Sequence, residues 1–152
     1  MATQSATVHA SCVLVGARAV LIRGQSGAGK SRLALELIQA AKRGDLRFAH
    51  LVADDRVRLA SADGRLLARP ADQLAGLLEV RGIGLLQLPY EACAVVGLVV
   101  DLDAADASRL PDPEMRETII EGISLPRLAV ASGAAPLPAV ISLLSSSSDG
   151  WL

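Results

Sequence analysis

The stretch "GQSGAGKS", residues 24–31, decides the fold of this chain. It fits G-x-x-x-x-G-K-[ST], the pattern of a phosphate-binding loop, or P-loop. Its glycines let backbone N–H groups turn inward onto phosphate oxygens, and the N-terminus of the following helix adds the positive end of a dipole. Lys30 is expected to reach the β- and γ-phosphates, and the Ser31 hydroxyl to ligate Mg²⁺. The predicted nucleotide-binding residues are Gly24, Gln25, Ser26, Gly27, Ala28, Gly29, Lys30 and Ser31.

The residues around the loop supply the strand and the helix that this motif requires. Residues 12–24 form two short apolar runs around Gly16, which predicts a hairpin whose second strand leads into the loop. After the loop, apolar residues recur every three or four positions from Ser31 to Lys42, which is typical of an amphipathic helix, and Gly44 is suited to end it. This context favours nucleotide binding over a chance glycine-rich turn.

The rest of the chain alternates strand and helix patterns. Further strands are predicted at 50–55, 95–102 and 123–130, and a hairpin over 56–68 that turns at Asp63 and Gly64. Short helices are predicted from Pro70 to Leu78 and from Leu137 to Leu144. We therefore expect one α/β domain over residues 1–144, a P-loop-containing mixed sheet with flanking helices, and a disordered tail over 145–152.

Composition and charge argue against several classes of partner. The formal net charge is −1, aromatic residues make up 2% of the chain, and no run of Lys or Arg exceeds two residues, so no nucleic-acid partner is expected. The apolar run at 92–100 is too short to span a membrane, and the N-terminus lacks the pattern of a signal peptide. Cys12 and Cys93 lack the spacing of metal ligands, so we expect reduced, buried thiols in a cytoplasmic protein.

Two adjacent carboxylates, Asp54 and Asp55, end the strand predicted downstream of the P-loop. Consecutive strand residues point in opposite directions, so one carboxylate can accept a proton from an attacking hydroxyl while the other faces the Mg²⁺ shell. A polar turn that exposes both to water is the alternative. Glu79 and Arg81 share one face of a predicted strand, which also suits a surface ion pair, and His9 alone suits a surface position.

Taken together, these features resemble the catalytic domain of the HPr kinase/phosphorylase family. The resemblance rests on "VHASCVLV" (8–15), "GQSGAGKS" (24–31), "LVADD" (51–55), "LLEVRGIGLLQL" (77–88), "SRLPDPE" (108–114) and "GISLPRLAV" (122–130). It implies a fold like that of phosphoenolpyruvate carboxykinase. It further implies a serine kinase that uses ATP and Mg²⁺ to phosphorylate HPr, the phosphocarrier protein of the phosphotransferase system, and a homo-oligomer that is hexameric in the family.

The resemblance also assigns roles to single residues. Asp54 becomes the proton acceptor from the substrate serine, with His9 near it. The full set of catalytic positions is His9, Lys30, Asp54 and Arg109. The metal positions are Ser31, Asp55 and Glu79. The family's signature segment corresponds to Leu78, Glu79, Val80, Arg81, Gly82, Ile83 and Gly84.

Three departures from the family bear on the activity. The N-terminal domain of full-length members has no counterpart in this sequence, and Gln25 and Arg32 stand where many members have acidic residues. The uncharged "ASGAAP" (131–136) corresponds to an arginine-rich stretch that the family uses in dephosphorylation. We therefore expect a kinase whose phosphorylase activity is weak or lost. Two alternatives stay open: a nucleotide-sensing regulatory protein without phosphoryl transfer, and a P-loop kinase of a small metabolite.

Overall fold

The computed structural model of the protein describes residues 6–146. The strands in this range are β1 (Ala6–Val8), β2 (Ala10–Val15), β3 (Arg18–Arg23), β4 (Ala49–Ala53), β5 (Val57–Ala62), β6 (Arg65–Pro70), β7 (Leu77–Val80), β8 (Gly84–Gln87), β9 (Ala94–Asp101), β10 (Glu117–Ile120) and β11 (Ile123–Ala129). The α-helices are α1 (Lys30–Lys42) and α2 (Leu137–Ser146), and the 3₁₀ helices are η1 (Asp72–Leu74) and η2 (Pro113–Arg116). No helix of this described part is long and apolar enough to cross a membrane.

A curled mixed sheet holds nine of these strands, in the order β1-β5-β6-β9-β3-β2-β4, with β11 beside β9 and β10 beside β11. The first residues of β9 pair with β6, and its last residues pair with β11. β3, β9 and β11 run parallel. β4 runs in the same direction, because β3 and β4 are both antiparallel to β2. The carboxyl ends of these four strands therefore meet at one edge.

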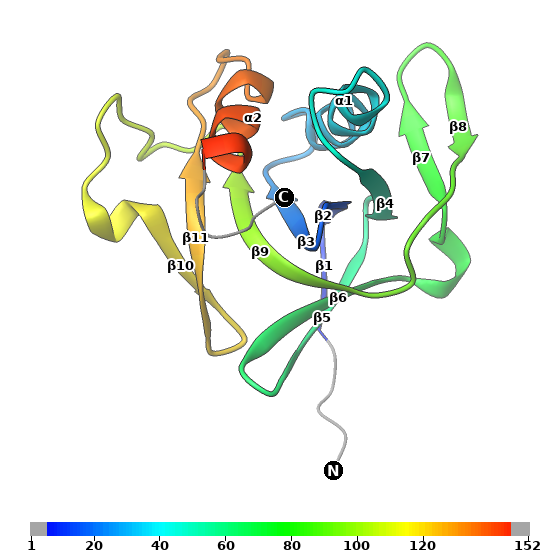
Figure 1. Ribbon diagram of the computed structural model, residues 1–152, viewed down its shortest axis with the longest axis horizontal. Coiled ribbons are helices and arrows are strands. Elements are labelled where there is room, and N and C mark those ends of the chain that lie inside the picture. The colour runs from blue at the N-terminus through cyan, green and yellow to red at the C-terminus, as the bar shows by residue number, and fades with distance from the viewer. Residues whose placement is uncertain (1–5, 147–152) are drawn as a thin grey trace.

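Both α-helices cover the same face of the sheet (Figure 1). The buried side of α1, with Leu33 and Leu37, packs in one apolar cluster with Val20 of β3, Leu98 of β9 and Val140 of α2. Each of these side chains is fully buried. Burial of one apolar stripe fixes α1 against the sheet, and with it the P-loop that precedes the helix.

The hairpin formed by β5 and β6 folds beneath the opposite face of the central strands (Figure 1). A second apolar cluster fills this layer and includes Cys12, Leu21, Leu59, Leu66 and Val99. Alternation along the central strands sends every second side chain to this side, so both faces are apolar. The central strands are thus held rigidly from both sides.

Most predicted elements are confirmed, and the exceptions have local causes. The hairpin before the P-loop, the helix after it, the hairpin turning at Asp63 and Gly64, and the strand at 95–102 all form within one or two residues of the predicted bounds. The helix predicted from Pro70 to Leu78 was wrong. Pro70 ends β6, where it pairs with Val57, and Gly76 at φ +78° separates η1 from β7.

The end of the chain and the cysteines also differ in part from expectation. α2 continues to Ser146, two residues beyond its predicted end, and residues 147–152 of the predicted tail lie outside the described residues. Cys12 is buried, as predicted, whereas Cys93 is exposed. Neither is in a disulfide.

Candidate functional site

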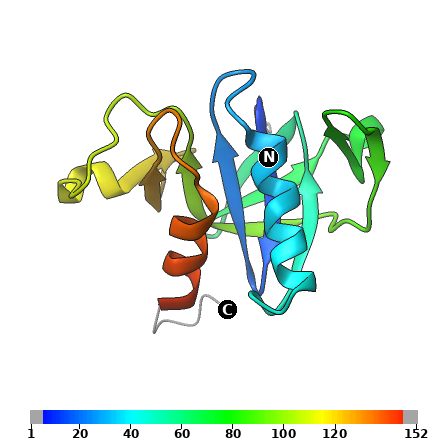
Figure 2. The ribbon, with the colours of Figure 1, turned by 90° about the horizontal axis from the view of Figure 1, so that it is seen from above.

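The P-loop leaves the end of β3 at the edge where the carboxyl ends of β3, β4, β9 and β11 meet. Figure 2 shows the segment after β9 and the turn before α2 on one side of the loop, and the β7–β8 hairpin on the other. Segments that are distant in the sequence therefore gather at one edge. In open α/β sheets, ligands bind outside the carboxyl ends of the strands. The candidate site lies here.

Two glycines explain the path of the P-loop. Gly29 precedes α1 with φ +101°, a left-handed conformation that residues with a side chain rarely adopt. A Cβ on Gly24 would lie 3.1 Å from Ala28 Cβ and 3.2 Å from Leu102 Cβ, so the bare backbone lets the loop pack closely there. α1 has no side-chain cap and no acidic residue in its first turn. Its first N–H groups are therefore suited to an anion.

Lys30 folds back over the loop. Its Nζ donates to the carbonyl oxygens of Gly24 at 2.8 Å and Gln25 at 3.0 Å. The ammonium is thus held within the segment predicted to bind phosphate. Arg32, a departure from the family pattern, is 83% exposed and lies 3.8 Å from Glu36 on the outer side of α1.

Asp54 is the buried carboxylate of the site, with 5% of its surface exposed. The Ser31 hydroxyl contacts both of its oxygens, at 2.8 Å from Oδ1 and 2.9 Å from Oδ2. The Ser11 hydroxyl of β2 donates to Oδ1 at 2.5 Å. Ser11 was not predicted, although a lone hydroxyl in the apolar strand "ASCVLV" was a signal. Residues of α1 and β2 therefore converge on the carboxylate that follows β4.

Asp55 faces different surroundings from its neighbour. Its side chain is 70% exposed, and the backbone turns at this residue with φ +68°. His9 Nδ1 lies 3.8 Å from Asp55 Oδ1, and the His9 side chain is 64% exposed. The resemblance implied that His9 lies near Asp54, but its observed partner is Asp55. The two adjacent carboxylates are therefore divided between a buried site and the surface.

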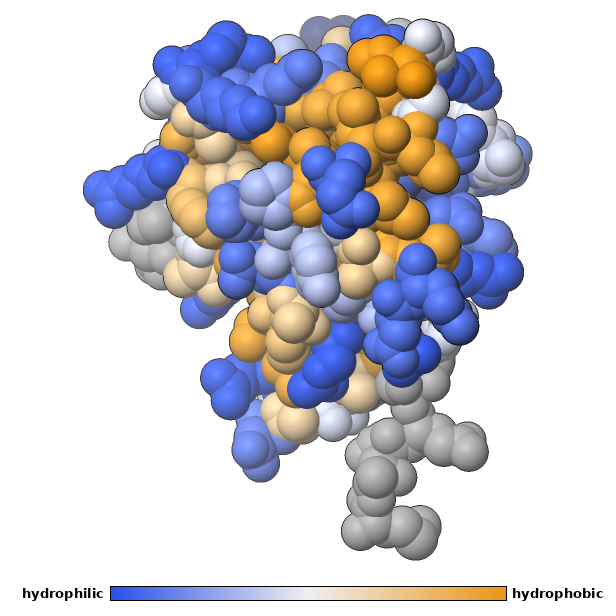
Figure 3. Space-filling view, turned by 90° about the vertical axis from the view of Figure 1, so that its right-hand side faces the viewer, coloured by the Kyte–Doolittle hydropathy of each residue, from blue (hydrophilic) through white to orange (hydrophobic). Residues whose placement is uncertain are grey.

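The signature segment forms the β7–β8 hairpin. Leu78 is buried in the cluster under α1, while Glu79 is exposed. β7 ends at Val80, so Arg81 belongs to the turn, and the expected strand face shared by Glu79 and Arg81 does not form. Figure 3 shows apolar residues gathered on the side of the molecule that carries this hairpin, where Ile83 is 67% exposed.

The site offers a partial set of ligands for Mg²⁺. Among residues 6–146, no group of three or more His, Cys, Asp or Glu side chains is arranged to hold a metal ion. Ser31 and Asp54, however, bring a hydroxyl and a carboxylate into contact. Mg²⁺ is commonly bound by one or two carboxylates together with substrate phosphates, so this pair fits the ion. Within residues 6–146, no described hydrogen bond or ion pair joins Glu79 to Ser31 or to Asp54.

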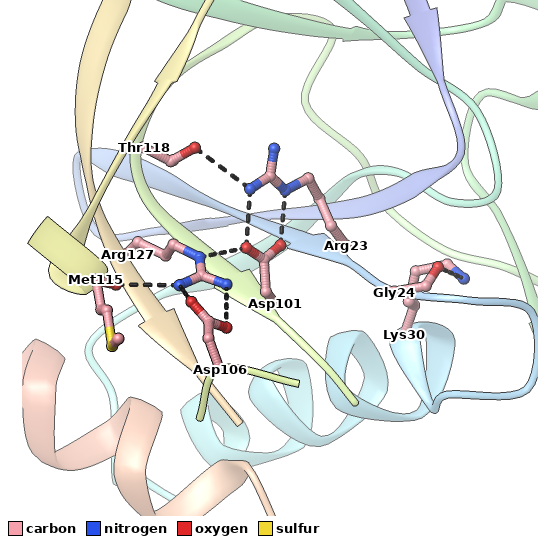
Figure 4. A network of polar contacts seen from close by, with 8 residues as sticks. All are labelled: Arg23, Gly24, Lys30, Asp101, Asp106, Met115, Thr118 and Arg127. Atoms are coloured by element: carbon pink, nitrogen blue, oxygen red, sulfur yellow. Dashed lines mark hydrogen bonds and ion pairs between the residues drawn. The ribbon is translucent and has the colours of Figure 1, made fainter. Parts of the chain in front are cut away.

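A second polar cluster lies beside the P-loop (Figure 4). Asp101, the last residue of β9, accepts hydrogen bonds from Arg23 at 2.7 and 2.8 Å and from Arg127 at 2.5 Å. Arg127 also donates to both oxygens of Asp106, at 2.8 and 2.9 Å. Arg23 directly precedes the P-loop, and Asp106 lies in the segment that carries Arg109. One carboxylate therefore links the root of the P-loop to that segment.

Arg109 itself is exposed. Within residues 6–146, the described hydrogen bonds and ion pairs of the segment after β9 do not include Arg109. Arg109 therefore lies in the segment after β9 without a described contact to Asp54 or Asp55, and its catalytic role stays a prediction. Arg23, Asp101 and Arg127 were not predicted as a cluster. The signal was an acidic residue at the end of the apolar run 95–100, but its partners depend on strand order.

The charges of the cluster account for its ionisation. Burial opposes ionisation of Asp101, but hydrogen bonds from Arg23 and Arg127 and the charges of both outweigh it and lower the pKa of this carboxyl. The hydrogen bond from Arg127 likewise lowers the pKa of Asp106. The same bond, with that to Asp101, raises the pKa of Arg127. All three groups are therefore charged at neutral pH.

The strand, glycine-rich loop and helix, with a buried carboxylate at the next strand end, define a P-loop protein of the phosphoenolpyruvate-carboxykinase-like fold. The chain belongs to the HPr serine kinase family: residues 1–130 match the family described as HPr Serine kinase C-terminal domain. The predicted resemblance is confirmed by this match.

Individual relatives of the chain belong to the same family. The chain is 36% identical over 135 residues to an HPr kinase/phosphorylase of Streptococcus thermophilus, and 35% identical to one of Streptococcus equi subsp. zooepidemicus. Each match covers 82% of this chain but 41% of the relative. The solved HPr(Ser) kinase/phosphatase from Coxiella burnetii is similar with a TM-score of 0.73 and 26% identity, covering 92% of this chain and 88% of that one.

We expect the Asp101 cluster to make stability fall at acid pH. Because its folded-state pKa lies below that of the unfolded chain, Asp101 adds stability above about pH 4, and this is lost as the pH falls through the folded pKa. Asp101→Asn should cost about 1–3 kcal/mol at pH 7 and give a flatter dependence of the unfolding free energy between about pH 5 and pH 2. Urea denaturation measures both, with the exposed Asp112→Asn as control. If the unfolding free energy of the wild type and of Asp101→Asn depended on pH with the same slope, this assignment would be contradicted.

Proposed function

We propose that this domain is a serine kinase that transfers the γ-phosphoryl group of Mg-ATP to HPr. The observation that carries the proposal is the contact between Ser31 and Asp54, which joins the predicted metal-binding hydroxyl to the candidate base. A base at this point is what phosphoryl transfer to a hydroxyl requires and simple nucleotide binding does not. The names of the relatives support HPr as the substrate.

Each residue has a defined task in the proposed reaction. P-loop N–H groups and Lys30 would hold the β- and γ-phosphates, and Ser31 and Asp55 would hold Mg²⁺. When bound, Mg²⁺ neutralises phosphate charge. Asp54 takes the proton of the substrate serine while the serine oxygen bonds to the γ-phosphorus. The bond to the β,γ-bridging oxygen breaks, and ADP leaves with that electron pair.

The remaining predicted residues complete this proposal. Arg109 would approach the transferring phosphoryl group from the segment anchored by Arg127, and Glu79 would join the metal shell from the β7–β8 hairpin. His9, next to Asp55, would stand at the entrance used by the serine. Assembly into a homo-oligomer belongs to the same proposal, and the mass of the protein in solution tests it.

Incubation with γ-labelled ATP, Mg²⁺ and HPr should place label on the carrier, and an HPr variant with alanine at the acceptor serine should stay unlabelled. Intact protein mass spectrometry provides a second measurement of the same transfer. A protein that binds Mg-ATP but leaves HPr unlabelled would favour the nucleotide-sensing regulator. Label on a small hydroxyl compound instead would favour the metabolite kinase.

Asp54→Asn should lower the rate of transfer to HPr by about 10²-fold or more, because general base catalysis contributes effects of this size. The folded variant should still bind ATP, since the P-loop backbone and Lys30 are unchanged. Single-turnover kinetics and calorimetric titration measure the two quantities, and Asp112→Asn, exposed and distant in sequence, is the control. Transfer at the wild-type rate would show that Asp54 is not the base.

Phosphorylase activity is proposed to be weak or lost, because residues 131–136 carry no charged side chain to hold inorganic phosphate. Phosphorylated HPr incubated with the protein, Mg²⁺ and inorganic phosphate should release little pyrophosphate, at a rate below about one hundredth of the kinase rate. Introduction of arginine at Ala131 and Ala134 should raise that release. Rapid pyrophosphate formation by the wild-type protein would contradict the proposal.

A further inference from the structure

Ser11 and Asp54 are the two buried polar or charged residues among the described side chains, and they contact each other. Ser11 is fully buried in β2, between residues whose side chains are also fully buried. Its Oγ lies 2.5 Å from Asp54 Oδ1. A hydroxyl in such surroundings needs a partner, and this carboxylate is the one that the register of β2 and β4 supplies. The contact is therefore built into the sheet.

The two hydroxyls on Asp54 differ in what else they can do. Ser31 belongs to the P-loop and contacts both carboxylate oxygens. In the proposed function its oxygen would also ligate Mg²⁺ through a lone pair, so its contacts would be shared between Asp54 and the metal. Ser11 is held in a strand, contacts Oδ1, and is fully buried. Its hydrogen bond to Oδ1 therefore does not depend on the metal.

We propose that Ser11 is a positioning residue for Asp54. It holds Oδ1 at the sheet, so that Oδ2 is presented to the hydroxyl of the incoming serine. Ser11 touches neither the nucleotide nor the protein substrate. The inference rests on the proposed function, since it assigns a partner to the candidate base.

Three substitutions at one position separate this role from simple packing. Ser11→Ala removes the hydroxyl, Ser11→Cys keeps the size with a poor donor, and Ser11→Thr keeps the donor. The Ala and Cys variants should lose about tenfold in kcat for HPr phosphorylation, as expected for loss of one hydrogen bond to a charged group. KM for Mg-ATP and Kd for Mg-ADP should change by less than about twofold. Ser11→Thr should recover most of the rate.

A measurement without turnover tests the contact itself. Equilibrium unfolding of the nucleotide-free wild type, Ser11→Ala, Asp54→Ala and the double variant forms a double-mutant cycle. The change in the unfolding constant of the double variant should differ by about fivefold or more from the product of the two single changes, because residues in contact are energetically coupled. The control is Ser61→Ala, which removes a hydroxyl from β5. It should show no coupling to Asp54→Ala and no loss of kcat.

The inference is overturned by wild-type kcat in Ser11→Ala, by a kcat loss matched by an equal loss of nucleotide affinity, or by absence of coupling in the unfolding cycle. Failure of the proposed function has a different signature, because the wild-type protein would then transfer no phosphoryl group to HPr. The unfolding cycle needs no activity, so in that case absence of coupling still refutes the Ser11 contact.

Discussion

A carboxylate with 5% of its surface exposed must find hydrogen-bond donors inside the protein, and Asp54 finds them in two hydroxyls. Ser11 reaches it from β2, and Ser31 from the first turn of α1. Loss of either contact would leave a buried carboxylate short of a partner, so this side chain also ties the first turn of α1 to β2. The apolar clusters hold the layers together, and the carboxylate adds a polar link between them at the edge.

Asp54 and Asp101 both lie at this edge of the sheet, but their partners differ: those of Asp54 are uncharged and those of Asp101 are cationic. Arg23 and Arg127 neutralise Asp101, so this carboxylate is committed to holding the P-loop root and the segment after β9. Among the described residues, no arginine, lysine or histidine side chain pairs with Asp54. Its hydroxyl partners orient the charge without cancelling it. A carboxylate held in this way is suited to a cation or a proton, whereas one held by two guanidinium groups is not.

The parts of this site that local sequence patterns determine were predictable. The P-loop, its strand and helix, and the acidic end of β4 all depend on spacing within a few residues. Contacts set by strand order were not predictable. Ser11 meets Asp54 because Cys12 pairs with Ala53, and Arg127 meets Asp101 because β11 lies parallel to β9. The contact of His9 with Asp55 likewise depends on the left-handed turn at that residue, which no local pattern indicated.

The same edge also bears on the direction of the proposed chemistry. In the kinase reaction the transferred phosphoryl arrives as part of ATP, held by the P-loop and Lys30. Phosphorolysis instead requires inorganic phosphate as a separate anion, beside a phosphoserine that is itself charged. Binding two anions together needs additional cationic groups. The turn at 131–136 lies at this edge and carries none, and Arg127 on the preceding strand is already occupied by Asp101 and Asp106. In the proposed function this charge distribution would favour phosphorylation over phosphorolysis, because it would limit the binding of inorganic phosphate beside the phosphoserine.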